Sequence, residues 1–345
     1  MSFALHVDGP RWRGWQDSVR DELAASGAAL APVAKGNGYG LGLPVLGAEA
    51  ARLGVGTVAV GLPHEVAQVR AGGYGGDVLV LTPWIPSVSP DPADDPALVL
   101  TASSPEAARA LAERGVRHVV EGLTSMLRHG IPPERLVAAG DLGEGLALHL
   151  PLNLSPDARV AEVKAWIDAA EDARLPLRRL WVSHLTADEV GQAARRAPGA
   201  EVVSRVGTRL WLGDRGALRP MGTVLDVHRL RRGDRYGYRQ RRAARAGWLL
   251  VVAGGTAHGV ALSAPTAAAS ARQRAVAAGT GALEAAGRSL SPLSWAGKQR
   301  WFAEPPHMQC SMVLLPVDVA PPEIGDRLAV DVRMTTARFD EVLGL

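Results

Sequence analysis

Between residues 29 and 213 the sequence alternates short apolar runs with alanine-rich stretches, and this alternation constrains the fold more than any other feature. The apolar runs predict eight strands: Ala29–Ala34, Thr57–Val60, Val78–Leu81, Leu98–Thr101, Val116–Val120, Leu146–Leu150, Leu180–Val182 and Val202–Val206. The stretches between them predict helices, among them LGAEAARLG, HEVAQVRAGG, SPEAARALAERG and SPDARVAEVKAWIDAAED, several of which open with Ser or Pro. Eight strands with intervening helices favour an α/β TIM barrel. An open doubly wound sheet is the alternative, because periodicity does not show closure.

After about residue 218 the pattern changes. Apolar runs such as TVLDVHRL, WLLVVA, MVLLPVDV and RLAVDVRM are separated by Gly, Pro and polar clusters, with one alanine-rich interlude at 262–288. We therefore expect a barrel over residues 1–218 and a mainly β domain over 219–345, with the boundary near Leu218-Arg219-Pro220.

Charge and composition exclude several classes of protein. The chain has 38 Lys and Arg against 35 Asp and Glu, and its arginine pairs are scattered along the sequence, so we expect no nucleic-acid partner. No apolar run approaches the ~20 residues of a membrane span, and the N-terminus lacks the pattern of a signal peptide. Cys310 is the only cysteine, which excludes an intrachain disulfide. We expect a cytoplasmic protein with no membrane partner.

One lysine occupies an unusual place. In ALAPVAKGNGYGLG, residues 29–42, Lys35 follows a predicted strand and precedes four glycines that end it. The chain uses lysine only at Lys35, Lys164 and Lys298, and elsewhere uses arginine as its basic residue. An amine, unlike a guanidinium, forms an imine with a carbonyl compound. Lys35 is therefore the first candidate for covalent chemistry.

Five motifs in order along the chain resemble those of the alanine racemase family, whose members are two-domain pyridoxal-phosphate (PLP) enzymes built on a TIM barrel. They are VAKGNGYGLG, VVEGLTSMLRHGIPPE, EGLALHLPL, SRVGTRLWLGD and GDRYGYRQ. The resemblance implies that Lys35 holds PLP and that Tyr238 is a catalytic base. It further implies a set of cofactor and substrate contacts: Tyr39, Gly207 and Thr208 at the phosphate, Arg205 at the pyridine nitrogen, His149 in the cofactor site, and Arg128 and Met308 at the substrate. Motif order places Ser183 or Thr186, from the seventh strand, at the phosphate as well.

These residue types suit a racemase. Removing an α-proton from one face and returning it from the other requires two bases flanking a planar intermediate, and Lys35 and Tyr238 fill those roles. A tyrosine base needs a nearby cation, because a free phenol has a pKa near 10, and we expect Arg205 and His149 to supply that field. Arg205 would keep the pyridine nitrogen unprotonated, and Arg128 would hold the substrate carboxylate.

The chain also departs from the family pattern. Glu121 stands where the family often has a lysine, and His307-Met308-Gln309 replaces Ser-Met-Asp. GGTAHGVAL replaces a Gly-Tyr-x-Asp-Gly segment, and the family's C-terminal tyrosine has no counterpart after FDEVLGL. These changes surround the substrate rather than the cofactor, so they leave the identity of the amino acid open.

We therefore expect a PLP-dependent isomerase that interconverts L- and D-amino acids, for which the resemblance suggests alanine. The same resemblance implies a homodimer with shared active sites and a role connected with the cell wall. Alternatives are a racemase or epimerase of another amino acid or peptidoglycan-related precursor, a non-catalytic PLP-binding protein, and a decarboxylase that uses Cys310. No metal site is expected, because the remaining histidines show no paired ligand spacing.

Overall fold

The computed structural model describes residues 2–262 and 289–345, so all but the first residue of the predicted alanine-rich interlude lies outside the described residues. The chain forms two compact units. One comprises residues 13–38 and 42–213, and the other comprises residues up to Trp12, Tyr39–Leu41 and residues 214–345. This division differs from the expected boundary at 218, because strand β1 (Phe3–Val7) pairs antiparallel with β10 (Leu218–Leu230) and so belongs to the C-terminal sheet.

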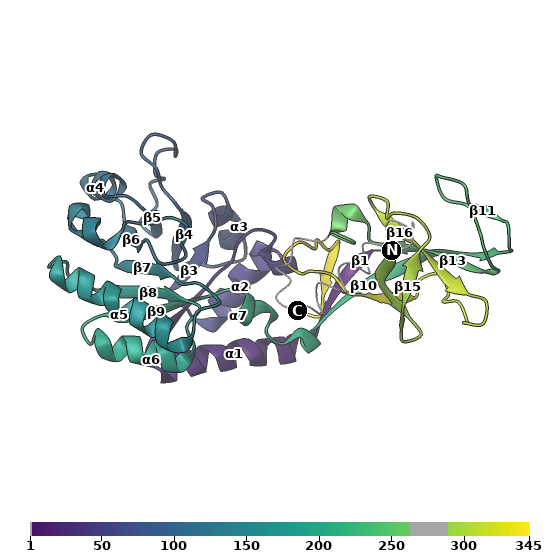
Figure 1. Cartoon of the computed structure of the whole chain (residues 1–345), viewed down its shortest axis with the longest axis horizontal. Coiled ribbons are helices and arrows are strands. Elements are labelled where there is room, and N and C mark those ends of the chain that lie inside the picture. Colours follow the sequence, from purple (N-terminus) through teal and green to yellow (C-terminus); the bar gives the residue numbers. More distant parts are fainter. Residues whose placement is uncertain (1, 263–288) are drawn as a thin grey trace. The chain divides into compact units, whose positions relative to one another are not determined.

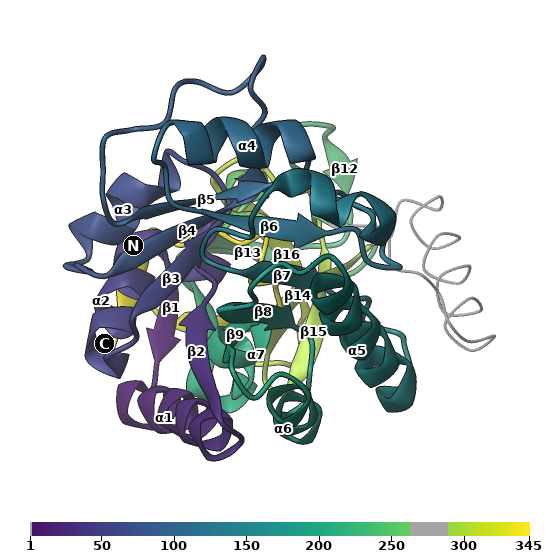
Figure 2. The same ribbon diagram turned by 90° about the vertical axis from the view of Figure 1, so that its left-hand side faces the viewer.

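The first unit contains a barrel of eight parallel strands, which confirms all eight predicted strands and the TIM-barrel fold (Figure 2). The strands are β2 (Ala28–Pro32), β3 (Thr57–Val60), β4 (Asp77–Pro83), β5 (Leu98–Ala102), β6 (His118–Gly122), β7 (Leu146–His149), β8 (Arg179–Ser183) and β9 (Glu201–Val206). They are hydrogen-bonded in the order β2-β9-β8-β7-β6-β5-β4-β3. A parallel bridge between Val33 and Ala59 joins the two ends, with the Ala34 N–H donating to the Ala59 carbonyl at 2.7 Å. This closure excludes the open-sheet alternative.

Helices lie around the outside of the strands (Figure 2). They are α1 (Gly9–Ala25), α2 (Leu43–Leu53), α3 (Glu65–Ala71), α4 (Pro105–Glu113), α5 (Pro156–Asp172), α6 (Ala187–Arg196) and α7 (Thr208–Leu212). Their starts follow the predicted capping signals: the hydroxyls of Ser104 and Ser155 accept from the first turns of α4 and α5, each of which has Pro at its start. Thr186 and Glu189 form a capping box on α6.

The barrel interior is a packed core, to which every strand contributes. Its side chains are Ala31, Val33, Ala59, Leu79, Val99, Val119, Ala147, Trp181 and Val203, all at most 7% exposed. Because this layer fills the barrel, a ligand has no passage through it. Chemistry is therefore confined to the ends of the strands.

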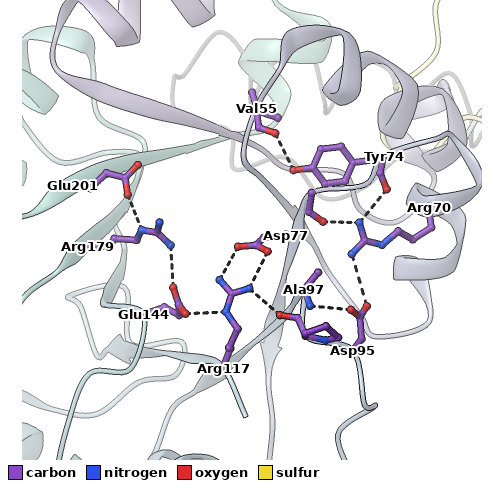
Figure 3. Close-up of polar contacts among 12 residues, drawn as sticks. Val55, Arg70, Tyr74, Asp77, Asp95, Ala97, Arg117, Glu144, Arg179 and Glu201 are labelled. Atoms are coloured by element: carbon purple, nitrogen blue, oxygen red, sulfur yellow. Dashed lines mark hydrogen bonds and ion pairs between the residues drawn. The ribbon is translucent and has the colours of Figure 1, made fainter. Parts of the chain in front are cut away.

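A chain of ion pairs follows the amino-terminal ends of the barrel strands (Figure 3). Arg179, the first residue of β8, bridges Glu201 on β9 at 2.6 Å and Glu144 before β7 at 2.9 Å. Arg117, just before β6, continues the chain to Glu144 at 2.8 Å and to Asp77 on β4 at 2.6 Å. A network of this kind contributes more than isolated surface pairs, so we assign this end of the barrel to stability.

The second unit is mainly β, as the sequence predicted (Figure 1). Besides β1 and β10 its main sheet contains β13 (Gly247–Ala253), β14 (Leu290–Trp295), β15 (Lys298–Phe302), β16 (Cys310–Pro316), β17 (Arg327–Val330) and β18 (Glu341–Leu343). Six strands in the order β13-β16-β15-β14-β17-β10 close on themselves through a β10–β13 pairing around a core that includes Phe3, Val224, Leu250 and Val313. A small hairpin of β11 (Arg235–Tyr236) and β12 (Arg241–Arg242) extends between β10 and β13. Among the described residues, no helix has the length and apolarity needed to cross a membrane.

Candidate active site

Five of the polar residues singled out in the sequence gather at the carboxyl ends of the barrel strands. Lys35 lies three residues beyond the end of β2, Glu121 lies in β6, His149 and Ser183 end β7 and β8, and Arg205 is the penultimate residue of β9. Because the strands are parallel and closed into a barrel, these ends share one mouth. Residues from motifs that are far apart in the sequence therefore lie in one cluster at this mouth.

Lys35 lies at the barrel mouth, where its surroundings lower the pKa of its amine. Its side chain opens to solvent, yet the surrounding barrel mouth desolvates it, and this lowers its pKa. The guanidinium groups of Arg128 and Arg205 lower the pKa further, whereas the carboxylate of Glu65 opposes them. A lowered lysine pKa increases the fraction of free amine, the form that attacks a carbonyl carbon.

Glu65 fixes the backbone beside this lysine, and sequence reasoning missed it. Its side chain is 4% exposed at the start of α3. Its Oε1 accepts from the Gly36 N–H at 2.6 Å, and its Oε2 accepts from the N–H groups of Gly61 and Leu62 at 2.6 and 2.9 Å. The carboxylate therefore ties the loop after β2 to the turn after β3. The only local signal is an acidic residue in the first turn of a predicted helix, which is common.

Arg205 presents an unused donor inside the barrel mouth. The side chain is 5% exposed, and its Nη2 donates to the Leu148 carbonyl at 2.9 Å. Its Nε is buried and has no hydrogen-bond partner among the described residues. Burial lowers the pKa of Arg205, while Glu121 acts in the opposite direction, and the group remains a cation near neutral pH. A buried donor without an acceptor fits a ligand that brings an acceptor atom.

Glu121 and Arg128 form an ion pair at the barrel mouth. Arg128 Nη2 lies 3.4 Å from Glu121 Oε1, while Glu121 Oε2 is buried without a hydrogen-bond partner. The loop between them turns back on itself, since the Ile131 N–H donates to the Glu121 carbonyl at 2.8 Å. Gly130 permits this turn, because a Cβ there would lie 2.5 Å from the Gly122 backbone. Desolvation raises the pKa of Glu121, and Arg205 and Arg128 act against that rise.

His149 does not carry the positive charge that we expected of it. Burial, followed by the charges of Arg205 and Arg128, lowers its pKa to about 3, so the imidazole is neutral near pH 7. Its Nδ1 lies 2.8 Å from the Ser183 hydroxyl, and its ring meets the His184 ring edge-on at 5.1 Å. His129, beside Arg128, is also neutral, because burial lowers its pKa to about 4. The positive field of the site therefore comes from the arginines and Lys35.

The residues that we expected to contact the phosphate lie on several different elements of the fold. Gly207 precedes α7 and Thr208 is its exposed first residue. The Thr186 hydroxyl caps α6, whereas the Ser183 hydroxyl faces His149. Tyr39 is 6% exposed and belongs to the second compact unit. The roles of these residues at a phosphate stay predictions.

Two expected site residues lie in the second unit. Tyr238 is 84% exposed and Met308 is 70% exposed. The backbone N–H of Tyr238 donates to Glu304 Oε2 at 2.9 Å, and its ring lies 4.6 Å from that of His307. Sequence reasoning did not identify Glu304, because it is separated from Tyr238 by 66 residues.

The fold and the site together define a class: a closed α/β barrel with a lysine after its first strand, buried and partly buried arginines at its mouth, and an appended β domain. Within residues 2–262 and 289–345 no cluster of three or more His, Cys, Asp or Glu side chains has the arrangement of a metal site. The chemistry of the mouth is that of an amine, two guanidinium groups and neutral imidazoles.

The particular family follows from comparison of the sequence with family models. Residues 17–180 match the model described as "Alanine racemase, N-terminal domain", so this part of the chain is similar to the alanine racemase family. No curated protein sequence matches the chain.

Solved structures of alanine racemases resemble the whole chain in fold. The enzyme from Bacillus anthracis superimposes with a TM-score of 0.69 at 15% identity, over 95% of this chain and 85% of that one. The enzyme from Oenococcus oeni gives 0.67 at 17% identity, over 95% and 88%. The enzyme from Bartonella henselae, solved with covalently bound PLP, gives 0.66 at 16% identity, over 96% and 90%. At these identities the likeness establishes the fold.

PLP is the cofactor that this family implies, and the residues at the barrel mouth fit it. Lys35 offers an amine with a lowered pKa, and Arg205 offers a buried donor without a partner. The three cations Lys35, Arg128 and Arg205 exceed the nearby carboxylates Glu65 and Glu121, and His149 adds no charge. The excess suits the negative charges of a phosphate and of a substrate carboxylate.

Proposed function

We propose that this protein is a PLP-dependent amino-acid racemase that moves the substrate α-proton with two bases, Lys35 and Tyr238. The observation that carries the proposal is the pairing, at one barrel mouth, of a lysine whose pKa is lowered with a buried arginine whose Nε has no partner. The family of the barrel and the covalent PLP in the Bartonella henselae enzyme support the choice of cofactor.

PLP, when bound, supplies a conjugated ring that acidifies the α-carbon of an attached amino acid. Lys35 would hold the cofactor through its amine, and the same amine would take or return the substrate α-proton on one face. Arg205, whose buried Nε–H has no partner among the described residues, would donate to the ring nitrogen of the cofactor. Because a guanidinium does not readily give up a proton, Arg205 leaves that nitrogen unprotonated and limits side reactions such as transamination.

Substrate and phosphate are held by neighbouring groups. Arg128 binds the substrate carboxylate, and Glu121, 3.4 Å away, orients its guanidinium without a modified lysine. Met308 contacts the substrate, and neutral His149 acts as a hydrogen-bonding wall of the cofactor site. The phosphate contacts that we propose are Tyr39, Ser183, Gly207 and Thr208.

Tyr238 is the second base, acting on the opposite face of the substrate. It is carried by the hairpin of the second unit with its side chain 84% exposed, which leaves the phenol free to enter another subunit's barrel mouth. We propose a homodimer in which each active site takes Lys35 from one chain and Tyr238 from the other.

Alanine is the substrate that the family resemblance suggests. A racemase or epimerase for another amino acid is the second candidate, and the specific observation in its favour is that His307 and Gln309 stand where the family has serine and aspartate. A decarboxylase that uses Cys310 is less well supported, because burial, together with Glu304, raises the pKa of this thiol and keeps it protonated.

The proposal is tested by fixing the cofactor and by following the α-proton. Borohydride reduction of the PLP-loaded protein should attach the cofactor to the peptide containing Lys35. Incubation with single L-amino acids in deuterium oxide should replace the α-proton of the substrate and generate both enantiomers. Lys35→Ala should abolish both results, whereas the matched control Lys164→Ala should retain them. Labelling of the Lys164 or Lys298 peptide instead would overturn the assignment.

A further inference from the structure

A buried carboxylate lies directly beneath the exposed tyrosine of the β11–β12 hairpin. Glu304, just after β15, is 3% exposed, and its Oε2 accepts from the Tyr238 N–H at 2.9 Å. The preceding Gly237 has φ +71°, and a Cβ at that position would lie 2.2 Å from the same oxygen. The positive φ favours glycine at this position, and without a Cβ there the carboxylate can lie against the turn that presents Tyr238.

The same carboxylate holds an imidazole against the tyrosine ring. His307 Nε2 lies 2.7 Å from Glu304 Oε1, and the His307 and Tyr238 ring centroids are 4.6 Å apart with the planes inclined by 39°. On its other side His307 Nδ1 lies 3.8 Å from Cys310 Sγ, and the His307 N–H donates to the Cys310 carbonyl at 2.9 Å. The imidazole is thus fixed at both nitrogens and at its backbone, and one of its faces packs on the phenol.

We propose that Glu304 and His307 are positioning residues for Tyr238: the carboxylate fixes the backbone of the tyrosine, and the imidazole fixes its ring. This inference rests on the proposed function, in which Tyr238 is the base for one face of the substrate. An exposed tyrosine retains two free side-chain torsions, and proton transfer requires its oxygen within hydrogen-bond reach of the substrate. A displacement of about 1 Å lowers a rate by about a hundredfold.

The arrangement is more than a turn support. A buried carboxylate is costly unless it is paired. Glu304 is paired with two groups, the backbone N–H of Tyr238 and the imidazole of His307, whose ring packs on that of Tyr238. A structural role alone requires only the first contact. The contact between Glu304 and His307 has a further use, because a catalytic tyrosine must keep its ring in one orientation.

The test uses the two directions of the reaction on the PLP-loaded, full-length enzyme. In a two-base racemase Tyr238 takes the α-proton from one enantiomer and Lys35 takes it from the other. If Glu304→Gln or His307→Gln displaces Tyr238, kcat should fall about ten- to a hundredfold. The primary isotope effect on the α-deuterated enantiomer that Tyr238 deprotonates should rise, because that step becomes rate-limiting. The isotope effect on the other enantiomer should fall.

Controls separate the inference from the proposed function. His228→Gln is the matched control, because His228 is an exposed histidine of the same unit that lies 3.3 Å from an acidic partner, Asp226, and it should change neither isotope effect. If Tyr238→Phe retained wild-type kcat, Tyr238 would not be a base, and both proposals would be overturned. If Tyr238→Phe were inactive while Glu304→Gln and His307→Gln kept both isotope effects at wild-type values, only the positioning role would be overturned. His307→Gln, at a partly exposed site, guards against a folding defect in Glu304→Gln.

Discussion

The carboxylate of Glu65 gives a sharp test of how the loop that carries Lys35 is held. Its two oxygens accept three backbone N–H bonds, one from Gly36 and two from the Gly61–Leu62 turn. Glu65→Gln keeps the size of the side chain but replaces one oxygen with an NH2 group. Whichever way the amide is oriented, at least one of these N–H groups faces a donor instead of an acceptor.

The cost follows from these contacts. Leaving one donor unpaired in a site where the carboxylate is 4% exposed costs about 1–3 kcal/mol, and the remaining bonds change from charge-assisted to neutral. We expect the free energy of unfolding to fall by roughly 2–4 kcal/mol and the melting temperature to fall by roughly 5–15 °C for a unit of this size. Loss of the negative charge should also lower the pKa of Lys35 further, because Glu65 is the group that opposes its depression by burial and by Arg128 and Arg205.

Urea denaturation measures the first effect, and the pH dependence of PLP attachment measures the second. Attachment to Lys35 should extend to lower pH in the variant, since the amine is then neutral at lower pH. Glu113→Gln, at an exposed position of α4, is the control and should leave both measurements unchanged. An unfolding free energy for Glu65→Gln within about 0.5 kcal/mol of wild type, at an unchanged denaturant slope, would refute the argument.

Other substitutions test the remaining claims. Arg205→Glu should slow racemisation and make transamination detectable, because a carboxylate favours a protonated ring nitrogen; unchanged rates would remove this residue from the cofactor. Lys35→Ala and Tyr238→Phe should each be inactive, and co-refolding them should restore about a quarter of wild-type activity if chains pair at random. Heterodimers proven by mass spectrometry but inactive would contradict a shared site. The pKa of His149 is about 3, so replacing it by Gln should leave the activity profile between pH 5 and 8 unchanged in shape; a lost inflection would show that it titrates there. Arg117→Met should lower the free energy of unfolding by about 1–2 kcal/mol, less at high salt, because its partly exposed pairs are screened.

The sequence by itself determined the barrel and the place of its lysine. Each of the eight strands is a local apolar run flanked by helix-capping and turn residues, so its identity depends on neighbours within a few positions. Lys35 follows a strand and precedes glycines, and parallel strands necessarily bring such positions to one edge.

Only the tertiary structure decided where the N-terminal strand pairs and which groups carry charge. The partner of β1 lies more than two hundred residues away, and no local pattern specifies such a pairing. His149 is neutral and Lys35 is activated because both are desolvated among guanidinium groups that come from other strands. Glu65 and Glu304 act through backbone N–H groups whose positions depend on folding, so their residue types alone gave no signal. Electrostatic roles depend on burial and on distances between segments, and those quantities exist only in the folded chain.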